Sequence, residues 1–479
     1  MKNAHKALLL GLALSLALAG GASAQVDFTK YIALGDSLAA GVVNYGSVKA
    51  YQDNSVPALI ARQAGVATFQ QPLVSEPGLP PLMELKALRI TPFGVSPVIA
   101  FKSGAGAPIN ATLSGPYNNL GIDGANTNDL LTRTGSILNL SADFGKYAQG
   151  LVGKVVPFSD LVLRDGKTTA IQQAIGGAGT FYTVNIGSNE VLGAALTAIA
   201  LDGVTMTPLA AFTAQYNSLL GALKAQRPNA KVMVSTVQDV LPFVTTVKPY
   251  LVVPTTGAKV YLIGEAGQLT ANDYLTLQAS ALIGQGIGIP KALGGTGLPL
   301  PEGSIDATGL HAGVILRGAE LLAIVTRIAQ MNAVIKSTAA SYGYGVVDTW
   351  AAFRSWDAHG VVVGGIKLTT GFLTGGIFSL DGAHPQQIGY GLMANEWIKA
   401  INEQFTMAIP PVNLRPLLLT ATAATSVQAA SFVLDQATGI QMIKGYAPYA
   451  LTDKLVVGRG VRNRGPVSTP GKASKPEVE

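Results

Sequence analysis

The chain has 479 residues, of which 33 are basic and 27 acidic, and it contains no cysteine. Charged residues make up only 13% of it, and no basic stripe with interleaved aromatic residues occurs in its body. This pattern excludes the usual nucleic-acid-binding surface. The lack of cysteine excludes disulfides and an N-terminal lipid anchor, so the chain is not a lipoprotein. At this length roughly three quarters of the unfolded surface is buried on folding, so a large core forms without cross-links.

The first 24 residues have the pattern of a signal peptide. Lys2 and Lys6 give a positive start, the apolar run 7–19 follows, and three small residues precede Gln25. The run is too short to span a bilayer comfortably, and no later stretch reaches that length without polar interruption. We therefore expect export to the periplasm or the cell exterior, with a mature chain starting near Gln25 and no stable membrane span.

Excess charge is concentrated at the C-terminal end. Without the two lysines of the signal segment the chain has 31 basic and 27 acidic residues, and residues 444–479 hold seven basic and three acidic ones. The expected C-terminal extension covers residues 412–479, and its composition predicts disorder from about residue 458. Three alternatives stay open for this tail: docking on the body, weak association with anionic lipid or envelope polymers, or no role. Its charge is too dilute to predict membrane binding.

Short apolar segments alternate with longer segments of helical periodicity along the chain. Strands are predicted at 31–34, 180–186, 230–236 and 345–348, and helices at 208–224 and 312–342. Glycines at the strand ends and this alternation favour an α/β fold whose central, mainly parallel sheet is covered on both faces. Ligands of such sheets bind beyond the carboxyl ends of the strands. Ser37 and Asn189 both lie just past the end of a predicted strand.

Two regions rich in glycine and proline interrupt the alternation, at about 43–115 and 245–310. We interpret both as long insertions into one domain that covers residues 25–411, and not as separate domains.

Three short clusters carry side chains suited to chemistry. They are Gly35-Asp36-Ser37-Leu38, Gly187-Ser188-Asn189 and Asp381-Gly382-Ala383-His384. Together they supply a hydroxyl, an amide, and an imidazole with a carboxylate three residues before it. Serine-based acyl transfer needs these groups as nucleophile, oxyanion donor, general base and the group that orients the base. The alternative for Asp36-Ser37 is helix capping, which is compatible with catalysis because a serine at a helix start also offers its own N–H to an oxyanion.

His384 is the expected base, and His359 is its main competitor. A spacing of three residues on one turn brings Asp381 and His384 to the same side, so the carboxylate can hold Nδ1–H while Nε2 faces Ser37. His311 has no carboxylate three residues before it.

Four blocks resemble the GDSL branch of the SGNH hydrolases, which are secreted or periplasmic esterases and lipases. The blocks are 31–38 (YIALGDSL), 119–130 (NLGIDGANTNDL), 184–190 (VNIGSNE) and 381–385 (DGAHP), and the resemblance spans about residues 28–411. It implies a flavodoxin-like, three-layer α/β/α fold. It also implies Ser37 as nucleophile, His384 and Asp381 as its partners, and an oxyanion hole of Ser37 N–H, Gly124 N–H and the Asn189 amide. Glu190 stands where the family usually has aspartate, and Asp123 where it commonly has proline; neither is expected to act on the substrate.

The resulting expectation is an exported serine esterase or lipase that needs no metal or organic cofactor and acts on a small-molecule or lipid ester. The insertions contain apolar residues placed to cover the site, which favours a hydrophobic acyl chain, although surface padding explains them equally well: Leu79, Leu82, Phe93 and Leu298. Two alternatives remain, an acyltransferase that uses the same site and a catalytically inactive surface-binding module.

Overall fold

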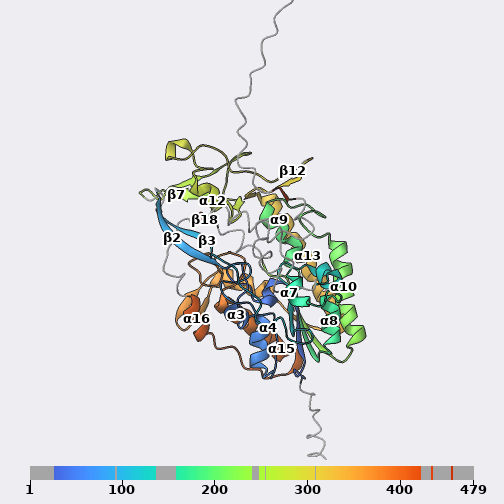
Figure 1. Ribbon diagram of the computed structural model, residues 1–479. Helices are drawn as coiled ribbons and strands as arrows, with labels where there is room; N and C mark the ends of the chain where they lie inside the picture. Colours follow the sequence, from blue (N-terminus) through green and yellow to red (C-terminus); the bar gives the residue numbers. More distant parts are fainter. Residues whose placement is uncertain are drawn as a thin grey trace, which may run out of the picture.

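The computed structural model describes residues 26–91, 94–135, 158–239, 247–253, 255–307, 309–421, 433–434 and 455–456 (Figure 1). The expected signal segment, Phe93 and the segment from residue 458 onward lie outside the described residues, as does nearly all of the basic tail.

A five-stranded parallel sheet forms the centre of the fold, in the order β15-β6-β5-β1-β4. Its strands are β1 (Tyr31–Gly35), β4 (Asn119–Gly121), β5 (Phe181–Asn185), β6 (Lys231–Ser235) and β15 (Gly345–Val347). The sheet confirms the four predicted strands, each within a few residues. The short edge strand β4 was not predicted, because three residues carry no periodic signal.

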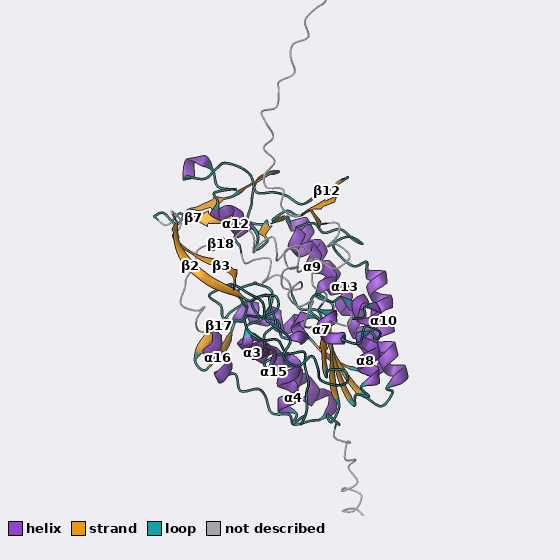
Figure 2. Ribbon diagram, viewed as in Figure 1, coloured by secondary structure: helices purple, strands orange, loops and turns teal. Residues whose placement is uncertain are grey.

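Alternate residues of these strands enter two separate hydrophobic clusters. Ile32 and Val184 belong to one cluster with α10 and α13, whereas Tyr31 and Phe181 belong to the other with α4 and α15. The sheet is therefore covered on both faces, and Figure 2 shows its strands between these two sets of helices. This arrangement is the predicted three-layer α/β/α fold of SGNH hydrolases.

The helices of the first face are α5 (Thr127–Thr132), α7 (Ser159–Leu163), α8 (Ala170–Gly176), α9 (Asn189–Thr197), α10 (Leu209–Gln226) and α13 (Gly318–Tyr342). Those of the second face are α4 (Val56–Gln63), α14 (Thr349–His359), α15 (Gln387–Phe405) and α16 (Arg415–Ala421). Short elements complete the body: α2 (Ser37–Ala40), α3 (Lys49–Gln52), β16 (Val361–Val363) and β17 (Ile366–Leu368).

Helix α13 starts at Gly318, six residues later than its periodicity predicts. The residues before it pair as the short strands β13 (Gly309–His311) and β14 (Ile315–Leu316). A capping interaction fixes the start, since the Glu320 carboxylate accepts the backbone N–H of Arg317 (2.6 Å). By length and composition α13 is the one described helix able to cross a membrane. Its buried side chains, among them Ile324 and Ile335, lie in the first core cluster, as expected for a core helix.

The first expected insertion begins with helices that belong to the body, because α4 packs against α15. Its later part is the antiparallel ribbon β2 (Met83–Thr91) and β3 (Gly94–Phe101). Leu79 and Leu82 are buried, at 2% and 1% exposure, whereas Leu298 of the second insertion is 41% exposed. Of the three described residues expected to cover the site, only Leu298 therefore offers apolar surface.

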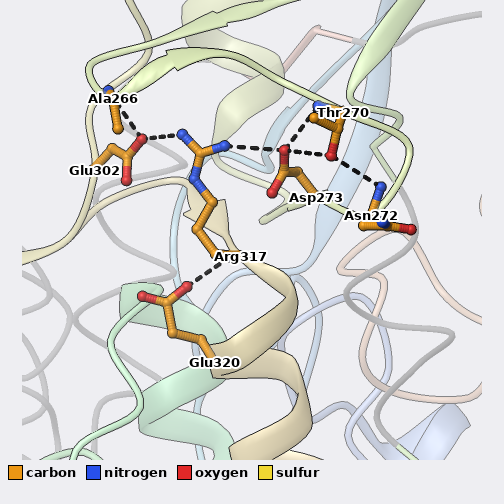
Figure 3. A network of polar contacts seen from close by, with 7 residues as sticks. All are labelled: Ala266, Thr270, Asn272, Asp273, Glu302, Arg317 and Glu320. Atoms are coloured by element: carbon orange, nitrogen blue, oxygen red, sulfur yellow. Dashed lines mark hydrogen bonds and ion pairs between the residues drawn. The ribbon is translucent and has the colours of Figure 1, made fainter.

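The second expected insertion has a small hydrophobic core of its own. It contains β7 (Tyr250–Val252), β8 (Lys259–Tyr261), β9 (Ile263–Gly264), β10 (Gly267–Gln268), β11 (Tyr274–Leu275), α12 (Ala279–Gly284), the 3₁₀-helix η1 (Lys291–Leu293) and β12 (Ser304–Asp306). Arg317 joins it to α13, because its guanidinium pairs with Asp273 (3.0 Å) and with Glu302 (Figure 3). Glu302 also accepts the backbone N–H of Ala266 (3.2 Å). These contacts hold the insertion at the start of the longest described helix.

The C-terminal extension contacts both the body and the insertions. Leu417 and Leu418 are buried in the second core cluster. Beyond α16, β18 (Val433–Leu434) pairs in parallel with β3, and β19 (Leu455–Val456) pairs in parallel with β13. The extension thus adds one short strand to each insertion.

Candidate active site

Ser37 is the first residue of α2 and is separated from the carboxyl end of β1 only by Asp36. Asp36 caps this helix, since its Oδ1 accepts the backbone N–H of Leu38 (3.0 Å). Because Asp36 takes the capping role, the hydroxyl of Ser37 is not used for it. The turn is tight: a Cβ on Gly35 would lie 2.4 Å from the Asn185 carbonyl oxygen and 2.7 Å from the Cβ of Ala39. Glycine at position 35 therefore allows α2 to start against the neighbouring strand.

Asp381 and His384 form a buried pair, with Asp381 Oδ2 2.9 Å from His384 Nδ1. The carboxylate also accepts three backbone N–H groups: Oδ1 accepts those of Ala383 (2.9 Å) and His384 (2.8 Å), and Oδ2 accepts that of Tyr45 (2.5 Å). Both side chains are almost inaccessible, at 0% and 3% exposure. The carboxylate thereby fixes the orientation of the imidazole and directs Nε2 to the opposite side of the ring.

The charges of the pair support each other. Burial alone raises the pKa of Asp381, but the charge of His384 and the hydrogen bonds to the carboxylate outweigh it, so that the pKa is lowered. Burial alone lowers the pKa of His384, but the charge and hydrogen bond of Asp381 outweigh it and the pKa is raised. The folded protein thus favours an ionised carboxylate beside the imidazole.

The loop of Asp381 and His384 is joined to the segment that follows Ser37. The backbone N–H of Asn44 donates to the Ser379 hydroxyl (3.0 Å), and the Asn44 side-chain oxygen accepts the N–H of the next residue, Leu380 (2.9 Å). The hydrogen bond from Tyr45 to Asp381 adds a third connection. Asp36, next to Ser37, is close enough for its charge to raise the pKa of His384. Residues 44–45, which follow Ser37 in the chain, therefore contact residues 379–381, which lie more than 330 positions later.

Gly124 and Asn189 lie on neighbouring segments beyond β4 and β5. Gly124 has a φ of 75°, in the left-handed region that favours glycine. Asn189 is the first residue of α9 and is 3% exposed, and its Nδ2 donates to the carbonyl of Ala125 (2.7 Å). The two expected oxyanion donors thus come from segments in direct contact.

The other histidines have different surroundings. His359 is exposed at the end of α14, and the nearby Asp357 carboxylate accepts the hydroxyl of Thr370. His311 Nε2 lies 3.0 Å from Asp306 Oδ1 in the β12–β13 hairpin of the second insertion. Among the described residues, no group of three or more histidine, aspartate and glutamate side chains is arranged to hold a metal ion.

Two further carboxyl groups belong to the candidate site, and sequence reasoning gave them no catalytic part. Burial raises the pKa of Asp36 to about 7 and that of the half-buried Asp123 to about 6. The charges of both raise the pKa of His384. The sequence did contain one indication that Asp123 is unusual: the family commonly has proline at this position.

Replacing Asp123 by asparagine is expected to move the acid limb of the pH profile of kcat/KM to lower pH. An ionised Asp123 favours the protonated imidazole, so its removal lets His384 reach the basic form at a lower pH. Measurement of kcat/KM for an activated ester across pH 4–9 checks this result. An acid limb that stays in place or moves to higher pH would contradict the electrostatic role of Asp123.

A comparison with protein families identifies the family of this chain. The model of the family GDSL-like Lipase/Acylhydrolase matches residues 31–397, so the chain belongs to this family. It is therefore a member of a family of ester hydrolases. A comparison with curated proteins gave no match.

Solved structures similar to the chain include phospholipase A1 from Streptomyces albidoflavus NA297, with 15% sequence identity, a TM-score of 0.31, and coverage of 78% of this chain and 98% of that one. Another is an extracellular lipase from Streptomyces rimosus, with 15% identity, a TM-score of 0.31, and coverage of 78% and 99%.

Proposed function

We propose that this protein is an exported serine hydrolase of carboxylic esters and that it works through an acyl-enzyme on Ser37. The observation that carries the proposal is the buried Asp381–His384 pair (2.9 Å), whose loop is hydrogen-bonded to the segment that follows Ser37. Membership of a lipase and acylhydrolase family supports the reaction type. The N-terminal sequence, with its positive start and short apolar run, supports export.

In the proposed reaction the Ser37 Oγ attacks the ester carbonyl carbon, while Nε2 of His384 takes the hydroxyl proton. Asp381 holds Nδ1–H and stabilises the imidazolium that forms. The tetrahedral intermediate collapses, its bond to the alkoxy oxygen breaks, and the leaving alcohol takes the proton from Nε2. Water then repeats the sequence at the acyl-enzyme, which releases the acid and restores Ser37.

The oxyanion of both intermediates is proposed to bind three donors: the backbone N–H groups of Ser37 and Gly124 and the side-chain amide of Asn189. An amide nitrogen carries two hydrogens, so the contact of Asn189 with Ala125 leaves the second for the substrate oxygen. Donors held in place before the reaction stabilise the charge as it develops.

The proposed substrate class is an ester with a hydrophobic acyl group, such as a lipid. Leu380 directly precedes Asp381, and Ala383 directly precedes His384; both are partly exposed and pack against the first core cluster. An apolar acyl chain covers such side chains better than a polar sugar does.

A fluorophosphonate probe tests the proposal directly, because it forms a covalent bond only with an activated serine. We expect stoichiometric labelling of the full chain, mapped to Ser37 by peptide mass spectrometry. A surface-binding module with an inactive site would remain unlabelled, and a label on another serine would refute the assignment of the nucleophile.

A further inference from the structure

Glu190 connects the two segments that carry the proposed oxyanion donors. It directly follows Asn189 in the first turn of α9 and is 1% exposed. Its Oε1 accepts the backbone N–H of Thr127 (2.7 Å). Thr127 is the first residue of α5 and lies three residues after Gly124. One carboxylate thus reaches from the start of α9 to the loop that follows β4.

The second carboxylate oxygen is fixed as well. Oε2 accepts the hydroxyl of Thr207, whose backbone N–H donates to the carbonyl oxygen of Glu190 (2.8 Å). Burial raises the pKa of Glu190, although the hydrogen bonds from Thr207 and Thr127 act in the opposite direction. A buried carboxyl group held by hydrogen bonds on both oxygens has little freedom to move. If it moved, an oxygen would lose its hydrogen bond without gaining one from water, which is costly in free energy.

Asn189 makes a parallel connection between the same two segments, through its amide and the carbonyl of Ala125. This bond, however, uses the amide that is itself the proposed donor. Of these two side-chain connections, the one made by Glu190 does not involve an oxyanion donor.

We propose that Glu190 is a positioning residue that sets the separation of the Gly124 loop and the start of α9, and with it the geometry of the oxyanion hole. The inference rests on the proposed function. Side-chain length matters here, because an aspartate at this position is one methylene too short to hold Thr127 and Thr207 together. Glutamine preserves the length: its oxygen accepts from Thr127 and its nitrogen donates to the Thr207 hydroxyl.

Four variants separate positioning from general stability. Glu190→Asp shortens the side chain, and Thr127→Pro removes the N–H at the first position of a helix, where proline is tolerated. Glu190→Gln preserves both contacts. Thr207→Val removes the hydrogen bond from the Thr207 hydroxyl to Glu190 but keeps the one from the Thr127 N–H. It therefore shows how much kcat changes from a loss of stability alone.

The experiment measures kcat, KM and the melting temperature of the full-length variants with a p-nitrophenyl ester, well below each melting temperature. For Glu190→Asp and Thr127→Pro we expect kcat to fall on the order of 10- to 100-fold, because a 1 Å misplacement can cost about 100-fold. KM should change by less than about twofold, since the loss falls on the transition state. Glu190→Gln and Thr207→Val should keep kcat near the wild-type value.

Wild-type kcat in Glu190→Asp and Thr127→Pro would overturn the inference. The inference would also be overturned if Thr207→Val and Glu190→Asp lowered the melting temperature equally and lost the same amount of kcat. If Glu190→Asp does not fold, Thr127→Pro decides alone. A parallel Ser37→Ala variant tests the proposed function separately, because turnover by that variant above one-tenth of the wild-type rate would refute the nucleophile whatever Glu190 does.

Discussion

Replacement of Ser37 by alanine should abolish ester hydrolysis, with a loss on the order of a million-fold in kcat. The hydroxyl is the proposed nucleophile, and alanine has no group that could form an acyl-enzyme in its place. The fold should persist, because Asp36 caps α2 through Leu38 and alanine is a good helix former. Hydrolysis of p-nitrophenyl esters and the melting temperature, measured on the same preparation, check both parts of the result.

Ser337→Ala is the matched control for Ser37→Ala. The Ser337 hydroxyl donates only within its own helix, to the carbonyl of Val334 (3.0 Å), so its loss should leave turnover unchanged. Turnover by Ser37→Ala above one-tenth of the wild-type rate would refute the nucleophile. A contaminating esterase is excluded if the residual rate resists further purification.

Asparagine at position 381 should lower kcat about 10,000-fold. Asp381 accepts hydrogen bonds on both oxygens, so either orientation of an asparagine amide places an NH₂ group against N–H donors. The imidazole then loses the partner that holds Nδ1–H and stabilises its charged form. Steady-state kinetics well below the melting temperature measure this loss, and circular dichroism shows whether the variant remains folded.

The chain contains a control for Asp381→Asn in Asp357→Asn. Asp357 precedes the exposed His359 by two residues and accepts a hydrogen bond from Thr370. Its replacement should leave kcat within about twofold of wild type, because surface changes have small effects. Equal losses in both variants would contradict the choice of His384 over His359.

The central strands were predictable because a strand buried on both faces is mostly apolar, as in β1 and β5. The edge strand β4 was not, since three residues beginning with Asn119 resemble a loop. The start of α13 was misplaced because residues 312–317 have an apolar pattern that also suits a helix. The strand β14 in this stretch depends on its partner β11, about 40 residues earlier in the chain.

The candidate site divides in the same way. The spacing of Asp381 and His384 predicted their pairing, because three residues on one turn bring the side chains together. The electrostatic part of Asp36 and Asp123 escaped prediction, since their raised pKa values come from burial among segments distant in sequence. The signal segment, the basic tail and the catalytic roles stay predictions.

The sequence by itself determined the family, four of the five strands of the sheet and the Asp381–His384 pair, because each motif or strand is a short run of neighbouring residues. Only the tertiary structure decided how the Ser37 segment meets the His384 loop and how Glu190 reaches Thr127. These contacts join residues 63 to 336 positions apart, and no local pattern specifies such distances.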